Sequence, residues 1–343
     1  MGKNIIKPNP VFIISRTDNI GDVVLTLPVA GILKQKYPQS TIWFIGKTYT
    51  EPIINLCENI DYFLNYDELK SLKETEIIEK IRQINADIFI HVFPDKLLAK
   101  VASRAKIPLR IGTMHRSFHW FRCNRLPNFS RKNSNLHEAQ LNLKLIESII
   151  NINDFPLECI HKYYGLHNAS PLKNEIISLM DNNKVKLILH PRSKGSAREW
   201  GPDNYSRLIN ILPPDKYQIF ITGTKDEGNS LKNFLDENSG RVIDLTGKLT
   251  LRELISFINQ SDCLIAASTG VLHIAAALGK SVIGLYAPIR PIFPRRWAPL
   301  GENAEFLVQG DENCSLCTKN TNCQCISGIK PETVSNILTK KYI

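Results

Sequence analysis

The sequence predicts an α/β fold of two doubly wound parallel sheets, and three observations support this prediction. Short apolar runs typical of buried strands alternate with helical patterns, which is the arrangement of strand–helix–strand units. The alternation pauses in the turn-rich segment 151–158 and restarts near residue 185. A chain of 343 residues is also long enough to bury two cores. We therefore expect two domains, residues 1–165 and 166–343, facing each other across a cleft.

The strands and helices are expected where apolar runs and 3.6-residue periodicity occur. The first half has expected strands at 11–15, 41–45, 87–93 and 110–112, with helices at 21–36, 74–85 and 137–150. The second half has expected strands at 185–189, 217–222, 241–244, 263–266 and 281–286, with helices at 203–211, 227–236, 251–259 and 271–278. The structure of residues 159–184 is left open.

Composition narrows the class of protein. The hydrophobic content of 43% and charged content of 22% are ordinary for a soluble globular protein. The formal net charge of +10 would attract an anionic substrate, an anionic membrane surface or nucleic acid. No run of five or more lysines and arginines occurs, so neither a nucleic-acid arm nor a polybasic anchor is indicated. No signal peptide or span of about 20 uninterrupted apolar residues is evident, so we expect a cytoplasmic protein.

Asp22 is the first candidate functional residue. It follows a buried strand and lies where the next helix opens, at Gly21-Asp22. Ligands bind outside the carboxyl ends of strands in open α/β sheets. A carboxylate at this place suits either helix capping or proton abstraction, and the local sequence alone leaves both open.

Two loops in the second half are candidates for binding a diphosphate. The segment HPRSKGSAREWGPDNYSRL at 190–208 follows a strand and holds hydroxyl, amide and cationic donors, among them Ser193, Lys194 and Arg198. It could equally be a solvated basic loop. In AASTGVLHIAAALGKSVIGLYAP at 266–288, a strand runs into Ser268-Thr269-Gly270 at the start of a helix, where backbone amides can approach an anion.

His273 lies in the first turn of that second helix and could point into the cleft or serve only as a structural residue. Other nucleotide-binding patterns are missing from the sequence. No G-x-G-x-x-G follows a strand, which argues against a NAD-dependent oxidoreductase. No D-x-D pair is present to hold a divalent metal beside a nucleotide sugar.

The cysteines are unevenly distributed. Four of the eight lie close together in a C-x2-C-x5-C-x-C pattern, at Cys314, Cys317, Cys323 and Cys325. Four thiols can satisfy one tetrahedral zinc or iron ion, which would be structural. Free thiols in a reducing compartment or adventitious disulfides are the alternatives.

Three segments together resemble glycosyltransferase family 9, the ADP-heptose:lipopolysaccharide heptosyltransferase family. They are IGDVVLTLP with LKQKYP at 20–38, the loop at 190–208, and STGVLHIAAALGKSVIGLYAP at 268–288. Supporting pieces are RIG at 110–112, HEAQLNLKLIE at 137–147, ITGTKDEGNSL at 221–231 and IKPETV at 329–334. The resemblance implies a GT-B fold of two Rossmann-like domains, the first binding the acceptor and the second the nucleotide-sugar donor.

The resemblance also implies a role for each matching residue. Asp22 corresponds to the general base that deprotonates the acceptor hydroxyl, in an inverting transfer that needs no metal or other cofactor. The residues that correspond to donor contacts are Ser193, Lys194, Arg198, Glu227 (ribose), Leu249 (adenine), Ser268, Thr269, Gly270 and His273. Arg198 stands where the family usually has Lys, and an arginine keeps the charge and can bind bidentately.

The resemblance leads us to expect transfer of heptose from ADP-L-glycero-D-manno-heptose to a lipopolysaccharide core acceptor. The enzyme would contact the inner face of the inner membrane peripherally and would bind no nucleic acid. Two departures leave the sugar open: Ser268 replaces the family's Asp, and Arg192 replaces a usual Gly. The alternatives are another nucleotide sugar, a protein acceptor, or a catalytically silent nucleotide-sugar-binding module.

Overall fold

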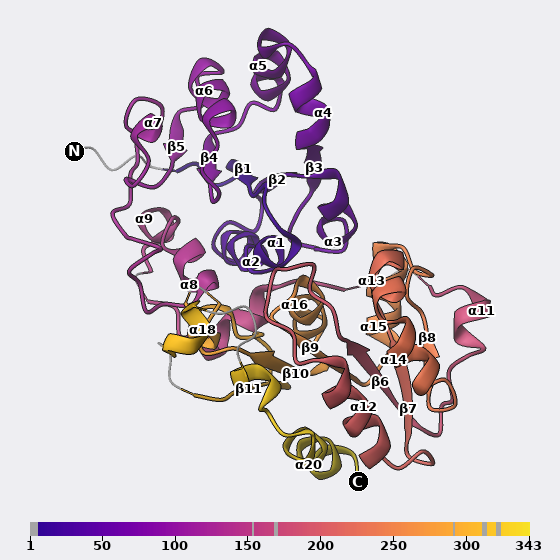
Figure 1. The fold of residues 1–343 in the computed structure, drawn as a ribbon. Helices are drawn as coiled ribbons and strands as arrows, with labels where there is room; N and C mark the ends of the chain where they lie inside the picture. Colours follow the sequence, from indigo (N-terminus) through magenta and orange to yellow (C-terminus); the bar gives the residue numbers. More distant parts are fainter. Residues whose placement is uncertain (1–5, 153, 168–170, 291, 311–313, 320–323) are drawn as a thin grey trace. The chain divides into compact units, whose positions relative to one another are not determined.

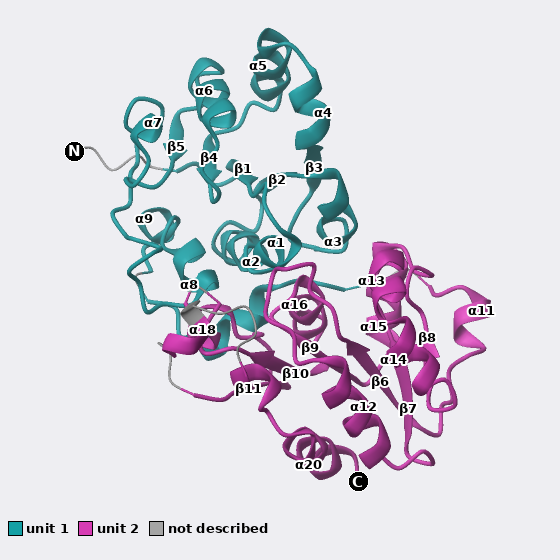
Figure 2. Cartoon of the chain, in the orientation of Figure 1, with its two compact units in different colours: residues 1–167 teal, residues 168–343 magenta. Residues whose placement is uncertain are grey.

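The structure is a computed structural model that describes residues 6–152, 154–167, 171–290, 292–310, 314–319 and 324–343. It divides into two compact units, residues 1–167 and 168–343 (Figure 2). Each unit contains one parallel sheet whose strands all come from that unit. Within the described part of the chain, no helix is long and apolar enough to cross a membrane.

Unit 1 contains a five-stranded sheet in the order β3-β2-β1-β4-β5 (Figure 1). Its strands are β1 Val11–Ser15, β2 Thr41–Gly46, β3 Tyr62–Asn65, β4 Ile88–His91 and β5 Leu109–Ile111. Its helices are α1 Ile20–Val24, α2 Leu27–Lys36, η1 Thr48–Thr50, α3 Glu51–Ile54, α4 Tyr66–Ser71, α5 Glu74–Gln83, α6 Lys96–Arg104, α7 Ser117–Trp120, α8 Glu138–Leu143, α9 Glu147–Ile150, α10 Leu157–Ile160 and η2 His161–Tyr163.

The first sheet is covered on both faces because its strands are apolar on both sides. Ile13, Ile45 and Phe89 pack with buried residues of α4, α5 and α6 in one core cluster. In Figure 1, α5 and α6 lie on one side of this sheet, and α1 and α2 lie on the other. Strands buried on both faces are typical of parallel sheets with helical crossovers.

Unit 2 contains a six-stranded sheet in the order β11-β10-β9-β6-β7-β8. Its strands are β6 Val185–His190, β7 Tyr217–Ile221, β8 Val242–Asp244, β9 Cys263–Ala267, β10 Ser281–Tyr286 and β11 Ala304–Val308. Its helices are α11 Asn174–Ile177, α12 Pro202–Ile211, α13 Lys225–Ser230, α14 Lys232–Glu237, α15 Leu251–Gln260, α16 Gly270–Ala277, α17 Pro294–Trp297, α18 Ser315–Lys319, α19 Gln324–Ser327 and α20 Pro331–Tyr342.

The second sheet is likewise covered on both faces. Trp200 and Tyr205 pack with β6 residues and with Val334 and Leu338 of α20 in one core cluster. On the other face, Phe257 of α15 lies against Phe220 of β7, with ring centroids 5.0 Å apart. Both units therefore have a buried core of their own.

All nine expected strands are present. The observed first and last residues of each strand differ from the expected ones by at most two positions. Two edge strands, β3 and β11, were not expected. Three expected helices are each divided in the structure: 21–36 into α1 and α2, 137–150 into α8 and α9, and 227–236 into α13 and α14. The prediction of one continuous helix in each of these ranges was therefore wrong.

The division between α1 and α2 has a clear cause. Pro28 is the second residue of α2, and a proline has no N–H to continue the hydrogen-bond ladder of α1. Thr26 turns the chain between the two helices and donates its hydroxyl to the Asp22 carbonyl at 2.8 Å. The break makes α1 a single short turn whose first residues include Asp22.

Candidate functional site

In unit 1, Asp22 lies at the topological switch point of the sheet. In the order β3-β2-β1-β4-β5, the chain runs outward in both directions from the neighbours β1 and β4. A crevice forms at the carboxyl ends of two such strands, and ligands bind there in open α/β sheets. Asp22 follows β1 directly, in the first turn of α1.

Asp22 belongs to a buried ionic network centred on Arg16. The Arg16 guanidinium is 3% exposed and donates hydrogen bonds to Asp18 at 2.6 Å and to Asp22 Oδ1. It also donates to Glu138 of α8 at 3.2 Å. Among the described residues, Asp22 Oδ2 has no hydrogen-bond partner, so one oxygen is held in place while the other can accept a proton.

The pKa of Asp22 is raised to about 6 in this network. Burial is the largest cause, since it disfavours the charged carboxylate. Arg16 lowers the pKa, whereas the negative charges of Asp18 and Glu138 raise it. A carboxyl group with this pKa is mostly deprotonated at neutral pH and can still take up a proton, as a general base must.

The short break between α1 and α2 is held by Asn142 of α8. Its side-chain amide donates to the Leu25 carbonyl at 3.0 Å and to the Thr26 hydroxyl at 3.2 Å. Its side-chain oxygen accepts from Arg16 at 3.3 Å and from Arg131 at 2.9 Å. One buried side chain therefore fixes both the backbone that presents Asp22 and the arginine that orients it.

Sequence reasoning missed Arg16, Asp18, Glu138 and Asn142. Glu138 is 122 positions from Arg16, and only the fold brings them together. Glu138 is buried at the start of α8, and a buried carboxylate needs a cationic partner, but its burial is known only from the fold.

In unit 2, the two candidate loops also meet at a switch point. The order β11-β10-β9-β6-β7-β8 places β6 beside β9, with His190 opposite Ala266 in the register. The loop after β6 carries Ser193, and the loop after β9 carries Thr269. The two loops that the sequence offers as candidate anion sites therefore follow neighbouring strands.

The loop after β6 is held by its own side chains. Glu199 accepts from the Ser193 backbone N–H at 2.9 Å and from its hydroxyl at 3.1 Å, and it pairs with Arg192 at 2.8 Å. Lys194 and Gly195 both have positive φ, +48° and +78°, so the chain turns sharply here. Ser193 is buried in this turn, Lys194 is exposed, and Arg198 is half-buried.

The loop after β9 ends at the N-terminus of α16. Thr269 is the N-cap residue, and Gly270 is the first residue of the helix. The Thr269 hydroxyl is buried and has no hydrogen-bond partner among the described residues. Buried hydroxyls are normally satisfied, so this one is a candidate contact for a bound group. Ser268 is half-buried beside it, and His273 is buried in the first turn.

Glu227 and Leu249 follow β7 and β8. Glu227 caps α13, since its Oε2 accepts from the Thr224 backbone N–H at 2.7 Å and from the Thr224 hydroxyl at 3.0 Å. Among the described residues, Glu227 Oε1 accepts no hydrogen bond. Leu249 is half-buried just before α15. Both residues follow strands on the same side of β6, at β7 and β8.

The cysteine cluster lies in the last part of unit 2. The sulfurs of Cys314, Cys317 and Cys325 lie within 4.8 Å of one another, and Cys314 Sγ is 3.5 Å from Cys325 Sγ. Zinc–sulfur bonds of about 2.3 Å in a tetrahedral site place sulfurs about 3.8 Å apart, so the spacing of these three suits a metal ion once Cys317 is reduced to a thiolate. Cys317 is disulfide-bonded in the structure, and Cys323 lies outside the described residues.

Two compact units, each with one parallel sheet and polar residues at its switch point, define the class of fold, a two-domain α/β protein. The family model of glycosyltransferase family 9 (heptosyltransferase) matches residues 75–326. Lipooligosaccharide heptosyltransferase 2 of Haemophilus ducreyi is 30% identical over 293 residues, which cover 80% of this chain and 82% of that protein. Lipopolysaccharide heptosyltransferase 3 of Escherichia coli is 23% identical over 293 residues, which cover 81% of this chain and 82% of that protein.

Solved structures show the same fold. The E. coli ADP-heptose lipopolysaccharide heptosyltransferase II matches with a TM-score of 0.74 at 17% identity, covering 96% of this chain and 98% of that one. The iron-containing dodecameric glycosyltransferase TibC of enterotoxigenic E. coli matches with a TM-score of 0.57 at 13% identity, covering 98% and 76%. The chain therefore belongs to glycosyltransferase family 9, it is a glycosyltransferase, and it has the GT-B fold expected from the sequence.

Proposed function

We propose that this enzyme transfers heptose, with inversion and without a metal, from ADP-L-glycero-D-manno-heptose to a lipopolysaccharide core acceptor. The observation that supports this most strongly is Asp22, a carboxylate with one oxygen held by Arg16, the other available, and a pKa raised to about 6. The similarity to named heptosyltransferases supports the choice of sugar and of acceptor.

In the proposed reaction, Asp22 Oδ2 takes the proton of an acceptor hydroxyl. The acceptor oxygen then forms a bond to the anomeric carbon, and the bond from that carbon to the diphosphate oxygen breaks. ADP leaves with the additional negative charge. Asp22 becomes a neutral acid, a form that its burial and the carboxylates of Asp18 and Glu138 favour and that Arg16 opposes.

The loops of unit 2 are proposed to hold the donor. The α16 N-terminus with Thr269 and Gly270, the Ser193 turn, and the cations Lys194 and Arg198 can offset the charge of a leaving diphosphate without a metal. Glu227 Oε1 is proposed to accept from the ribose, Leu249 to contact the adenine, and Ser268 and His273 to line the sugar-phosphate side. In this proposal, residues 1–165 bind the acceptor and residues 166–343 the donor.

The enzyme is proposed to work on the cytoplasmic side of the inner membrane, in peripheral contact with it. A glycolipid acceptor would be anchored there. The formal charge of +10 favours an anionic surface of that kind.

Product analysis tests the reaction. The purified enzyme is incubated with ADP-heptose and a heptose-deficient lipopolysaccharide core, and the product is analysed by mass spectrometry alongside a panel of other nucleotide sugars. We expect one added heptosyl residue with ADP-heptose alone. Ser268 stands where the family has Asp, so a different donor sugar is the main alternative. If another nucleotide sugar is turned over and ADP-heptose is not, the proposed donor is wrong.

Replacement of the proposed base tests Asp22. Asp22→Asn keeps the size of the side chain and removes the proton acceptor, so kcat should fall by about 10²- to 10⁴-fold. ADP binding, measured by calorimetry, should stay unchanged. Asp154→Asn, at an exposed aspartate of the same unit, is the matched control and should retain full activity. Full activity of Asp22→Asn would show that another group is the base.

The cysteine cluster is proposed to hold a structural zinc or iron ion through Cys314, Cys317 and Cys325 in the reduced protein. The ion would tie together α18 and α19 and would take no part in the reaction. Metal analysis of protein purified under reducing conditions should find close to one zinc or iron per chain. Cys314→Ser with Cys325→Ser should lose it, whereas Cys159→Ser, at a free half-buried thiol elsewhere, should keep it. Metal-free protein with all thiols titratable would reject the site.

A further inference from the structure

The net positive charge of the chain is concentrated in one segment of unit 1. Residues 96–137 contain ten of the 43 lysines and arginines and none of the 33 aspartates and glutamates. The remainder of the chain therefore has 33 residues of each sign, and the whole formal charge of +10 belongs to this segment. The ten cations are Lys96, Lys100, Arg104, Lys106, Arg110, Arg116, Arg122, Arg125, Arg131 and Lys132. The segment is basic because it lacks acidic residues, although it contains no run of five or more lysines and arginines.

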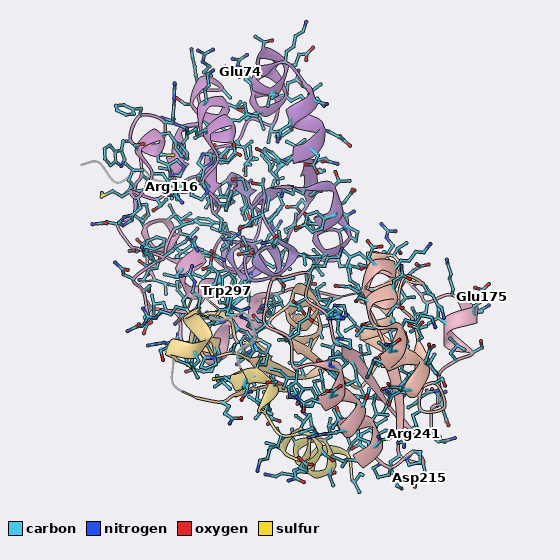
Figure 3. The ribbon with its side chains drawn as sticks, viewed as in Figure 1. Glu74, Arg116, Glu175, Asp215, Arg241 and Trp297 are labelled. Atoms are coloured by element: carbon cyan, nitrogen blue, oxygen red, sulfur yellow. The ribbon has the colours of Figure 1, made fainter. Side chains whose placement is uncertain are left out.

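A loop in the middle of this segment exposes large apolar side chains. We call residues 113–125 the aromatic loop; it includes the short helix α7. Met114 is 39% exposed, Trp120 is 58% exposed and Phe121 is 80% exposed. Exposed aromatic residues grouped in this way mark an interaction surface. Arg116, labelled in Figure 3, is the N-cap residue of α7.

The aromatic loop is held rigidly from its inner side, so the exposure of its aromatic residues is built into the fold. His119 is fully buried, and its Nδ1 lies 3.1 Å from the Thr113 carbonyl. Arg125 forms a parallel bridge with Ile111 at the end of β5. The Trp120 indole N–H donates to the Met114 carbonyl at 2.6 Å, which fixes the outward-facing ring.

The arginines of the aromatic loop are available for an anionic partner. Among the described residues, no carboxylate forms an ion pair with Arg116, Arg122 or Arg125. The cations on α6 differ, since Lys100 and Arg104 both reach Glu74, at 2.5 Å and 3.3 Å. Arg116 and Arg125 are exposed.

We infer that the aromatic loop docks unit 1 on the surface of an anionic lipid bilayer. Tryptophan and phenylalanine settle at the headgroup level, and arginines bind lipid phosphates. A second copy of the chain suits this surface poorly, because pairing the aromatic loop with itself would bring together two sets of three arginines that have no carboxylate partner among the described residues. The inference rests on the proposed function, because it assigns the peripheral membrane contact to a particular loop and a glycolipid acceptor lies in such a surface. Its test measures vesicle binding and does not require sugar transfer.

Vesicle flotation of the full chain tests the inference. Vesicles of phosphatidylcholine alone are compared with vesicles that also contain phosphatidylglycerol, at roughly 30% of the lipid. The salt concentration is about 0.1 M, at which surface charges still act over about 10 Å. We expect binding only to the anionic vesicles. The variant Arg116→Gln with Arg125→Gln should bind about 30-fold more weakly, at five- to sixfold for each arginine near an anionic surface. Arg252→Gln, at an exposed arginine of unit 2, should bind as the wild type does.

The apolar contribution is tested separately. Trp120→Ser with Phe121→Ser should weaken binding by about tenfold or more, whereas Phe306→Ser, at an exposed phenylalanine of unit 2, should not. If the double variant does not fold by circular dichroism, Phe121→Ser alone replaces it. Anionic vesicles should also shift the fluorescence of the wild type to the blue, and Trp120→Phe should remove that shift.

Three results would overturn the inference: equal binding to both kinds of vesicle, undiminished binding of both double variants, or loss of self-association in the aromatic variant without loss of vesicle binding. The last would assign the surface to a second copy. Activity on a delipidated, water-soluble core acceptor separates this inference from the proposed function. The loop variants should retain that activity, and its absence in the wild type would reject the proposed reaction while leaving the vesicle result valid.

Discussion

At Asp22, burial and two neighbouring carboxylates outweigh the attraction of Arg16, and the pKa rises in consequence. The network contains Arg16 and Arg131 against Asp18, Asp22 and Glu138, so full ionisation would leave one uncompensated negative charge. Protonation of one acid relieves this excess. In the proposed reaction, Asp22 is the acid that accepts this proton, which it takes from the acceptor hydroxyl.

The pH dependence of the reaction should report this group. A general base must be deprotonated, so kcat/KM should fall as the pH drops through about 6, the value to which the pKa of Asp22 is raised. Arg16 lowers that pKa, so Arg16→Gln should move the acidic limb of the profile to higher pH. A limb that stays in place in this variant would be assigned to titration of the substrate.

Among the elements, α2 depends on one glycine. A methyl group at Gly31 would lie 2.2 Å from the Tyr163 carbonyl oxygen of η2, closer than any real contact. Glycine in the middle of a helix costs about 1 kcal/mol relative to alanine, so its presence here is explained by the close approach of η2.

Substitution of this glycine gives a stability prediction. Gly31→Ala should lower the free energy of unfolding by about 2 to 3 kcal/mol, since a packed backbone must move to admit the methyl group. Gly240→Ala is the matched control, because nothing lies within 4 Å of its added methyl group. Urea unfolding of both variants measures the difference. Equal stabilities would mean that α2 and η2 can separate at no cost.

The elements also show how far the sequence predicts the structure. Six of the nine expected strands are apolar runs of five or six residues, and burial on both faces of a parallel sheet makes such runs visible in the sequence. The edge strands β3 and β11 were missed, and both contain exposed residues: Tyr62 in β3, and Glu305 and Phe306 in β11. Asp22 could be selected from its place after a strand. Glu138 and Asn142, which share Arg16 with it, come from a helix more than 110 residues away, and only the fold reveals them.

At the scale of the whole molecule, the two proposed half-sites belong to different units. Each unit has its own sheet and its own core. A fragment of residues 168–343 should therefore unfold cooperatively and bind ADP with an affinity within about tenfold of the full chain, and it should transfer no sugar because Asp22 is missing. Calorimetry with ADP measures this, with Thr269→Val in the fragment as a variant that should bind more weakly. A fragment that folds but ignores ADP would contradict the placement of the donor site.

The separation of the two sheets also has a consequence during synthesis. Every strand of the first sheet is made before the first strand of the second, since β5 ends at Ile111 and β6 begins at Val185. Ribosomes add about 5 to 20 residues per second, so residues 168–343 take about 10 to 35 s to make after unit 1 is complete. Unit 1 therefore has time to fold while unit 2 is still being translated, and the parallel strands of the two sheets need never be unpaired at the same moment.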